Sequence, residues 1–356
     1  MSRFAERVVA WQRRDGRHDL PWQGTRDAYR LWLSEVMLQQ TQVATVIPYY
    51  ERFLARFPSV AALAAAPVED VMALWAGLGY YSRARNLHAC AQAVESEHGG
   101  RFPESAEALA RLPGIGASTA AAIAVFAFGE RAAILDGNVK RVFARHFGVA
   151  GWPGEAAVAR ELWRLAHEAV PERDVEAYTQ GLMDLGATVC TRSRPACAVC
   201  PVAGTCVARS QGRQAEMPGA RPRRERPLRA ASFVLLTQGS QVLLERRPPA
   251  GIWGSLLALP QFEPDLGEAA LSAAVQARFG LSVRGLERLP ARHHDFTHYR
   301  LELQTWRGRA SAGRMADPGN VEWWERGALD QAALPAPHRS LLREAEPAGL
   351  FAEPGG

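Results

Sequence analysis

Glu35 is the first residue of this sequence whose type and position suggest chemistry. It lies within residues 31–43, where apolar side chains surround almost the whole helical wheel, a pattern typical of a buried helix. Burial disfavours the ionised form of a carboxyl group and raises its pKa, so Glu35 is a candidate general acid near neutral pH. The same pattern also fits an ordinary glutamate that bonds to a neighbouring helix or reaches solvent.

A second carboxylate, Asp136, lies in Ile134-Leu-Asp-Gly-Asn-Val-Lys-Arg-Val142, directly before a predicted helix. Aspartate is a favoured helix N-cap, and that role requires no catalysis. A capping carboxylate is also expected to stay ionised and well oriented, so a structural and a chemical role are compatible.

Four of the five cysteines form the pattern Cys-x6-Cys-x2-Cys-x5-Cys: Cys190, Cys197, Cys200 and Cys206. Thiolates at this spacing can converge on one centre, and the spacing leaves both a structural zinc ion and an iron-sulfur cluster open. An odd number of cysteines with four clustered argues against a disulfide framework. Cys90 stands alone on a predicted helix, where a small buried hydrophobic residue is the simplest interpretation.

A glycine turn in Leu112-Pro-Gly-Ile-Gly-Ala-Ser-Thr-Ala120 joins two predicted helices. Gly114 and Gly116 permit tight turning and leave backbone N–H groups uncovered at the start of the second helix, where a phosphate can bind. The alternative is an ordinary helical hairpin with a glycine turn.

The elements that must position these residues fall into two regions. Residues 1–207 contain Ala/Leu-rich helical segments separated by short turns, which predict an all-α domain. Residues 208–228 are basic and contain Pro and Gly, as expected of a linker. Residues 229–356 are predicted to form a mixed α+β domain, so the chain is expected to be multidomain.

Three patterns support the mixed character of the second domain. Residues 233–236 and 241–244 flank a Gln-Gly-Ser turn and predict a β-hairpin. A helix is expected over residues 268–279. Residues 296–306 alternate between apolar and polar side chains, which indicates a strand.

Composition limits the function classes. The 356 residues are 47% hydrophobic and 22% charged, as in a folded protein with two domains. The formal net charge of +5 permits a polyanionic partner such as DNA without requiring one. The start lacks the apolar region of a signal peptide, and no apolar run is long enough to span a bilayer, so a cytoplasmic protein without membrane contact is expected.

Together, these motifs closely resemble the MutY family of adenine DNA glycosylases, within the endonuclease III (helix-hairpin-helix) superfamily. The resemblance covers nearly the whole chain. The motifs that carry it are the glycine turn, the cysteine loop, Pro21-Trp22, residues 32–42, Gly77-Leu-Gly-Tyr-Tyr-Ser-Arg83 and residues 134–140. It implies an all-α helix-hairpin-helix glycosylase domain, a loop that binds a [4Fe-4S] cluster with a structural and DNA-docking role, and a Nudix-like second domain.

The resemblance implies a hydrolase that removes adenine mispaired with 8-oxoguanine or guanine during base excision repair. Glu35 would protonate the departing adenine, and Asp136 would stabilise positive charge on the sugar, as in glycoside cleavage by two carboxylates. Related bifunctional enzymes carry an attacking lysine after the hairpin, where this sequence has Ser118, so a monofunctional enzyme is expected. A nucleophilic Ser118 is the weaker alternative, because no histidine lies near it in sequence.

By the same resemblance, Gln40 and Tyr80 would intrude into the duplex, while Trp22 and Gln180 would line a pocket for the extruded adenine. Extrusion is required because the glycosidic bond cannot be reached properly inside a stacked duplex. The alternatives are core aromatic side chains for Trp22 and Tyr80, and helix-surface amides for Gln40 and Gln180.

The second domain resembles the Nudix-like domain of the same family. A working Nudix box needs metal-binding glutamates, but the best local match, residues 273–281, keeps Val275, Gly280 and Leu281 and lacks every glutamate. The sequence His294-Asp-Phe-Thr-His298 instead resembles the Phe-Ser-His loop that reads 8-oxoguanine. The residues implied in lesion contact are Phe296, Thr297 and His298.

Three other functions stay open at this stage. A bifunctional thymine-glycol-type endonuclease is disfavoured by Ser118, and a nucleotide-pool Nudix hydrolase is disfavoured by the missing glutamates. A non-enzymatic iron-sulfur DNA-binding protein would differ only in releasing no base. The expected partner is double-stranded DNA with adenine opposite 8-oxoguanine or guanine, bound by a monomer at the nucleoid if the source is bacterial.

Overall fold

The computed structural model describes the chain except for residues 1–2, 223–224, 249–250, 297, 312–319 and 346–356. The chain forms two compact units: Met1–Ala66 with Arg85–Arg223, and Pro67–Ala84 with Arg224–Gly356. The break at 223/224 falls inside the segment that we expect to be a linker. Nothing in the sequence indicates that Pro67–Ala84 groups with the second unit, and the domain limits 1–207 and 229–356 stay a prediction.

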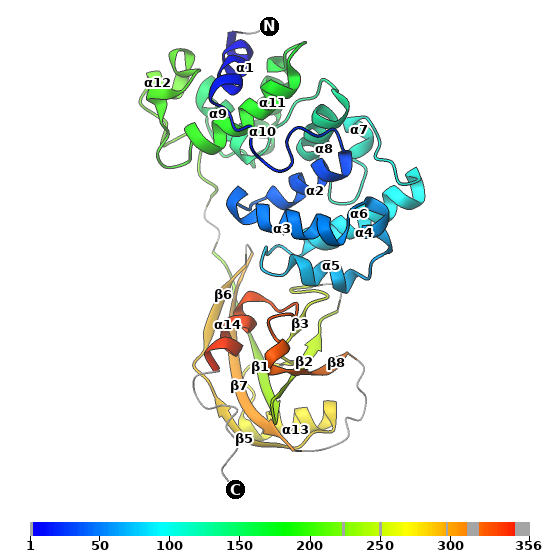
Figure 1. Ribbon diagram of the computed structural model, residues 1–356. Helices are drawn as coiled ribbons and strands as arrows, with labels where there is room; N and C mark the ends of the chain where they lie inside the picture. The colour runs from blue at the N-terminus through cyan, green and yellow to red at the C-terminus, as the bar shows by residue number, and fades with distance from the viewer. Residues whose placement is uncertain (1–2, 223–224, 249–250, 297, 312–319, 346–356) are drawn as a thin grey trace. The chain divides into compact units, whose positions relative to one another are not determined.

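The first unit is helical throughout its described residues (Figure 1). Its α-helices are α1 (Arg3–Asp15), α2 (Ala28–Leu38), α3 (Val43–Arg56), α4 (Val60–Ala65), most of α6 (Ser82–His98), α7 (Ala106–Leu109), α8 (Ala117–Ile123), α9 (Gly137–Phe147), α10 (Ala156–Ala169), α11 (Val175–Asp184) and α12 (Val207–Ser210). Short π-helical turns, Ala124–Phe128 and Leu185–Val189, extend α8 and α11, and 3-10 turns occupy Cys197–Val199 and Ala203–Thr205. The helix α5 (Val68–Trp75) belongs to the second unit.

An apolar cluster and a buried aromatic pair help to hold the first unit together. Phe4, Phe143 and Tyr178 bring α1, α9 and α11 into one buried core. Trp32 of α2 is fully buried and packs against Phe102 with ring centroids 5.2 Å apart. Burying each of these aromatic side chains contributes roughly 1.5–3 kcal/mol. These contacts therefore fix α2, which carries Glu35, and α9, which begins directly after Asp136.

The helix that carries Glu35 is shorter than the apolar run predicts. It ends at Leu38, and the Thr41 N–H donates to the Leu38 carbonyl at 3.2 Å. Gln40 adopts a left-handed conformation with φ of 59°, which breaks the helical repeat. Residues 39–42 are all polar and supply no apolar side chain to continue a buried face, so a turn replaces the expected helix before α3.

The second unit is built on an eight-stranded mixed sheet in its described residues. Its strands are β1 (Leu228–Gln238), β2 (Gln241–Arg246), β3 (Leu257–Ala258), β4 (Gln261–Phe262), β5 (Val283–Arg288), β6 (Arg292–Asp295), β7 (Arg300–Ala310) and β8 (Val321–Glu325). The path β3-β2-β1-β7-β5 is joined by β4 beside β1, β6 beside β7 and β8 beside β2. β1 and β7 run parallel, and the other pairs run antiparallel. The predicted β1–β2 hairpin and the helix α13 (Glu268–Phe279) are confirmed.

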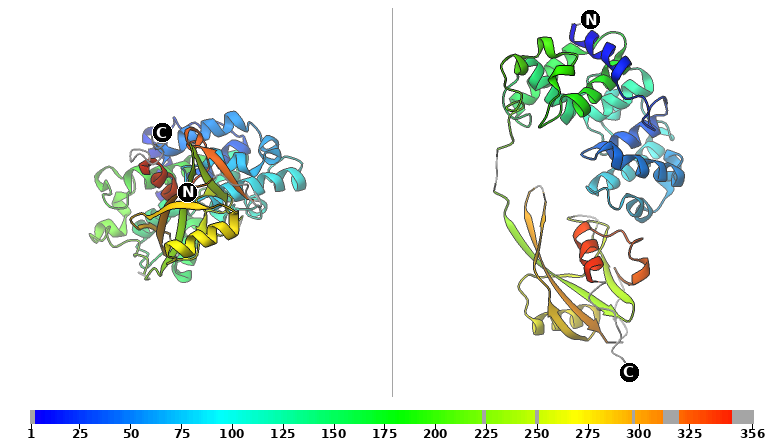
Figure 2. Two further views of the ribbon diagram at one scale, coloured as in Figure 1. Left: turned by 90° about the horizontal axis from the view of Figure 1, so that it is seen from below. Right: turned by 60° about the vertical axis from the view of Figure 1, so that its left-hand side comes forward.

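The helices α13 and α14 (Ala336–Ala345) cover opposite faces of this sheet (Figure 2). Val234 and Leu236 of β1 share a core with Leu271 of α13. Their neighbour Phe233 points to the other face, because side chains alternate along a strand, and its ring lies 4.8 Å from that of His338 on α14. A short 3-10 turn, Arg326–Ala328, precedes α14.

The alternating segment 296–306 is a turn followed by a strand rather than one continuous strand. The Phe296 N–H donates to the Tyr299 carbonyl at 2.9 Å, which closes the turn between β6 and β7. Tyr299, Leu301 and Leu303 are buried as the alternation predicts. The turn has no glycine or proline, so the sequence offered little signal for it; Thr297 lies outside the described residues.

None of the described helices is long and apolar enough to cross a membrane.

Candidate active site

An open cavity of about 1120 Å³ in the first unit brings together four of the predicted site residues: Trp22, Glu35, Asp136 and Gln180. They come from the segment after α1, from α2, from the residue before α9 and from α11. Residues distant in sequence thus line one cavity that opens to solvent. Gln40, Tyr80 and Ser118 are not among the residues that line it.

Glu35 is held in this cavity by a capped and buried helix. Asp27 caps α2 by accepting from the Tyr29 N–H at 2.9 Å. Leu31 and Trp32 beside Glu35 are buried, and Glu35 itself is half-buried because it borders the cavity. The surrounding protein nevertheless desolvates the carboxyl group. This burial, with a smaller effect from the negative charge of Asp136, raises the pKa of Glu35 to about 8.

The sequence resemblance implies base release that depends on a protonated Glu35, and the rate of such a reaction should follow this pKa. We expect the single-turnover rate to be constant below pH 7 and to fall as the pH rises through about 8, where Glu35 loses its proton. A rate profile between pH 6 and 10 on one duplex measures this. A rate that stays constant up to pH 10 would contradict the assignment of Glu35 as the acid.

The raised pKa of Glu35 also has a consequence for stability. Between the unfolded value of about 4.3 and the folded value of about 8, the unfolded chain ionises first, so stability falls as the pH rises through this window. Glu35→Gln cannot ionise and should therefore melt at a higher temperature than the wild type at pH 7.5, with the difference disappearing near pH 4. Thermal melts of both proteins at the two pH values test this.

Asp136 is the N-cap of α9, as its position predicts. Its Oδ1 accepts from the Val139 N–H at 2.7 Å. Burial raises the pKa of Asp136, which is the opposite of the direction expected from capping alone. Hydrogen bonds from Val139 and Asn138 and the positive charges of Arg141 and Lys140 act against burial and favour the ionised form.

Ser118 supports the segment that carries Asp136. Its Oγ accepts from the Leu135 N–H at 2.9 Å, directly before Asp136. This bond joins α8 of the helical hairpin to the start of α9. The hydroxyl thus has a backbone partner next to the cavity, although sequence analysis predicts a substrate contact for it.

Trp22 and Gln180 occupy the cavity wall in different ways. Trp22 is buried and packs edge-on against Tyr50, with ring centroids 5.4 Å apart. Gln180 donates from Nε2 to Asp184 Oδ1 at 2.9 Å. Arg17, which also lines the cavity, binds the same carboxylate through Nε at 2.7 Å. Sequence analysis did not identify Arg17 or Asp184; only the four-residue spacing of Gln180 and Asp184 on one helix could have suggested their contact.

Gln40 and Tyr80 share an unusual backbone conformation. Gln40 has φ of 59° and Tyr80 has φ of 50°, values that are uncommon for residues other than glycine. Gln40 is exposed, and the Tyr80 side chain, in the second unit, retains 49% exposure. The Arg83 guanidinium lies 5.5 Å from the centre of the Tyr80 ring. Both residues are thus presented to solvent on turns.

The two glycines of the predicted hairpin turn have different surroundings. Gly114 has φ of 74°, and a Cβ built there would lie 2.6 Å from the Asn86 Cβ. Gly116 is the N-cap of α8, has φ of −85°, and a Cβ there would meet nothing within 4 Å. Gly114 is therefore required by the fold, whereas Gly116 leaves open space beside the backbone.

Alanine at these two positions should separate folding from DNA binding. Gly114→Ala is expected to lower the free energy of unfolding by about 1–2 kcal/mol or more, through the left-handed backbone and the contact with Asn86. Gly116→Ala should leave urea unfolding nearly unchanged but weaken DNA binding, because the methyl group fills the space where a phosphate would approach. Equal DNA affinity of Gly116→Ala and wild type would rule out this phosphate contact.

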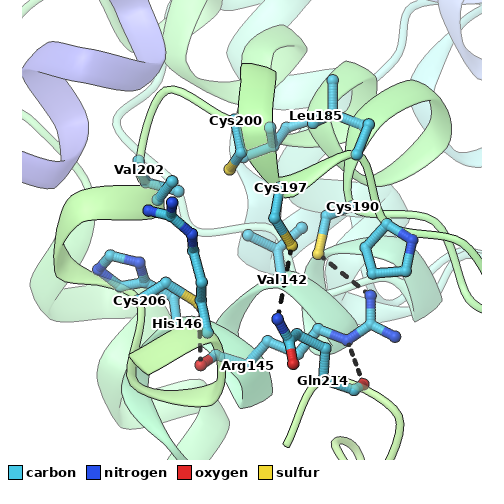
Figure 3. A pocket seen from close by; sticks show the side chains of 15 residues that line it. Val142, Arg145, His146, Leu185, Cys190, Cys197, Cys200, Val202, Cys206 and Gln214 are labelled. Atoms are coloured by element: carbon cyan, nitrogen blue, oxygen red, sulfur yellow. Dashed lines mark hydrogen bonds between the residues drawn. The ribbon is translucent and has the colours of Figure 1, made fainter. Parts of the chain in front are cut away.

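The four clustered cysteines, Cys190, Cys197, Cys200 and Cys206, line one small cavity of about 20 Å³ (Figure 3). Burial, and to a smaller extent the neighbouring thiols, raise the pKa of Cys200 to about 11. In the described part of the chain, no three His, Cys, Asp or Glu side chains are grouped so as to hold a metal ion. The four cysteines line this one cavity, and thiolates as a donor set suit either a zinc ion or an iron-sulfur cluster.

Arg145 fastens this cysteine loop to α9. Its Nη1 donates to Cys190 Sγ at 3.4 Å and to the Thr191 carbonyl at 2.6 Å. Its other nitrogens donate to the carbonyls of Arg192, Gln214 and Met217. A buried guanidinium with this many partners holds the loop rigidly, and it places a positive charge beside sulfur.

The turn predicted to read 8-oxoguanine lies among aromatic rings. Phe296 packs 5.6 Å from Trp253 and 4.7 Å from His294, measured between ring centroids. His298 is exposed, and its ring lies 4.7 Å from Tyr299. Phe296 is thus seated on the sheet while His298 faces solvent.

Comparison with known proteins gives a consistent result for both units. Residues 33–168 match the HhH-GPD superfamily of base excision DNA repair proteins, and residues 231–344 match the NUDIX domain. The structure of a thermostable thymine-DNA glycosylase is similar to the chain at 29% identity and a TM-score of 0.53, covering 58% of this chain and 95% of that one. The predicted fold class, a helix-hairpin-helix domain followed by a Nudix-like domain, is confirmed.

Two relatives extend the similarity beyond one domain. An adenine DNA glycosylase of Buchnera aphidicola is 33% identical over 300 residues, which cover 84% of this chain and 85% of that protein. The adenine DNA glycosylase of Homo sapiens is 34% identical over 405 residues, covering 96% of this chain and 74% of that protein. With two matching domains and relatives this similar over most of their length, the chain belongs to the adenine DNA glycosylase family.

Proposed function

We propose that this protein hydrolyses the N-glycosidic bond of adenine mispaired with 8-oxoguanine, or with guanine, in double-stranded DNA. The observation that carries the proposal is the shared cavity of Glu35 and Asp136, in which the pKa of Glu35 is raised to about 8. The identity of the excised base, adenine, and the base excision repair pathway are inferred from membership of the adenine DNA glycosylase family.

Glu35 acts as the general acid. A carboxylic acid that keeps its proton at neutral pH can donate it to adenine N7 as the bond to the sugar lengthens. The base then leaves as a neutral molecule, and the electrons of the broken bond go to the purine. The sugar is left with the positive charge of an oxocarbenium ion.

Asp136 stabilises that cation. Its carboxylate is oriented by the Val139 N–H and lies near the positive charges of Arg141 and Lys140. A negative group fixed in advance stabilises developing positive charge without reorganising during the reaction. Water then adds to the sugar carbon and loses a proton, which completes hydrolysis.

The adenine reaches this cavity by leaving the base stack. Trp22 and Gln180 contact the extruded base, and Gln40 and Tyr80, exposed on their turns, enter the duplex near the lesion. Gly114 and Gly116 of the hairpin approach the DNA backbone. Unfavourable unstacking of the base is offset by these contacts.

The enzyme is monofunctional. Ser118 has its hydroxyl bonded to the Leu135 N–H, and a hydroxyl without an adjacent base is a weak nucleophile. Water therefore attacks the sugar, and the DNA backbone stays intact at the abasic site.

Cys190, Cys197, Cys200 and Cys206 would hold a [4Fe-4S] cluster. Their position around one cavity and the N–H donor from Arg145 to sulfur support this assignment. When bound there, such a cluster would supply iron-thiolate bonds that hold the loop together, and Arg192, Arg194 and Arg209 of the same region would contact DNA phosphates.

In the second unit, Phe296, Thr297 and His298 recognise the 8-oxoguanine that remains in the duplex. The exposed ring of His298 and the packed ring of Phe296 suit contact with a base opposite the excised adenine. The domain does so without Nudix hydrolysis, because the box residues 273–281 contain no glutamate.

One assay tests the proposed function. A labelled duplex with adenine opposite 8-oxoguanine is incubated with the protein, and strand breaks are compared with and without alkali. Breaks that need alkali support a monofunctional glycosylase. Breaks without alkali favour a bifunctional enzyme, and no base release favours a non-enzymatic DNA-binding protein.

A further inference from the structure

Asp184 is a fully buried carboxylate directly behind the wall of the active-site cavity. It is 0% exposed and is not among the residues that line the cavity. A carboxylate in such a place must have its oxygens bonded to donors, because an unpaired buried charge is costly. Its donors identify its role.

Arg17 holds the Asp184 carboxylate from two sides. The Arg17 backbone N–H donates to Oδ2 at 2.9 Å, and its Nε donates to Oδ1 at 2.7 Å. The Thr188 hydroxyl donates to the Asp184 carbonyl at 2.8 Å. With a guanidinium on one oxygen and an amide N–H on the other, the carboxylate is fixed in place.

The remaining donor is Gln180, one helical turn earlier on α11, which gives its Nε2 hydrogen to Asp184 Oδ1 at 2.9 Å. An ionised carboxylate accepts hydrogen bonds and cannot donate them, so only the amide nitrogen of Gln180 can face it. The orientation of the Gln180 amide is therefore dictated chemically by Asp184. The amide presents its carbonyl oxygen and its second N–H to the cavity in one fixed order.

We infer that Asp184 is a positioning residue that sets base selectivity by locking the amide of Gln180. The inference rests on the proposed function, in which Gln180 faces the extruded base. A locked amide with oxygen and N–H side by side matches a purine edge that offers an amino donor next to a ring-nitrogen acceptor, as adenine does. Hypoxanthine offers the reverse order, a carbonyl acceptor next to a ring N–H donor, and would need the amide turned over.

The test compares adenine with hypoxanthine, each opposite 8-oxoguanine in the same duplex, under single-turnover conditions. The wild type is expected to prefer adenine. Asp184→Leu removes the acceptor that faces Gln180 Nε2, so the Gln180 amide is no longer locked, and the ratio of adenine to hypoxanthine release should fall at least about tenfold. Asp184→Glu keeps an acceptor-only group and should keep the preference even if its total rate is lower.

The ratio of adenine to hypoxanthine release is the informative readout, because a merely structural defect lowers both release rates together. An unchanged ratio in Asp184→Leu overturns the inference. If that variant does not fold, Gln180→Met decides: it keeps the size of the side chain without its amide and should lose the same preference, and an unchanged ratio there also overturns the inference.

Failure of the proposed function would look different. A wild type that releases no adenine contradicts the glycosylase assignment. In that case, the role of Asp184 is tested by comparing the affinities of wild type and variant for the adenine duplex and the hypoxanthine duplex. Tighter binding of the adenine duplex by wild type but not by Asp184→Leu supports the role of Asp184, and equal discrimination by both contradicts it.

Discussion

Glu35→Gln is expected to bind a duplex with adenine opposite 8-oxoguanine as well as the wild type does, yet to release adenine about 10²- to 10⁴-fold more slowly. The amide has nearly the same shape but no acidic proton, and general acid catalysis contributes roughly this factor. Single-turnover base release measures the rate, and a gel-shift titration measures the affinity.

The matched control for this substitution is Glu107→Gln on α7. The Glu107 side chain is 81% exposed and forms an ion pair with Arg111 away from the cavity. Its rate should equal that of the wild type. Retained activity in Glu35→Gln, with the control unaffected, would remove Glu35 from the mechanism and leave the family assignment standing.

Asp136 should show two separable functions when it is replaced by asparagine and by alanine. Asn keeps a side-chain oxygen that can accept from the Val139 N–H, so Asp136→Asn should unfold nearly like the wild type. It loses the negative charge, and base release should fall about 10²- to 10³-fold. Asp136→Ala should lose the same activity and also about 0.5–2 kcal/mol of unfolding free energy with the cap.

Asp27→Asn supplies the control for this pair. Asp27 caps α2 by the same chemistry, accepting from the Tyr29 N–H, but it does not line the cavity. Its asparagine variant should keep both stability and rate. If Asp136→Asn also keeps the wild-type rate, Asp136 is a cap and nothing more.

Features set by local sequence were predicted well. The cap at Asp136 and the helix α13 depend on neighbouring residues, and the structure has both where the pattern puts them. The apolar surroundings of Glu35 are also a local property, because the residues beside it on the same helix supply them. For such features, a short stretch of chain contains most of the physical cause.

Features that depend on distant parts of the chain were missed. Arg17 and Asp184 are separated by most of the first unit, and neither residue is unusual in its own segment. The turn at Gln40 was overlooked because the apolar pattern before it suggested that the helix continues. The grouping of Pro67–Ala84 with the second unit likewise has no sequence signal.

The parallel pairing of β1 with β7 bears on how the second unit folds. The register joins Leu228 to Arg300 and Thr237 to Arg309, so most of the unit must be synthesised before β1 meets this neighbour. Closing such a long loop is entropically costly, and contacts between distant residues slow folding. The helical first unit gains many of its contacts within single helices and between neighbouring ones. The first unit is therefore expected to fold before the sheet of the second unit is complete.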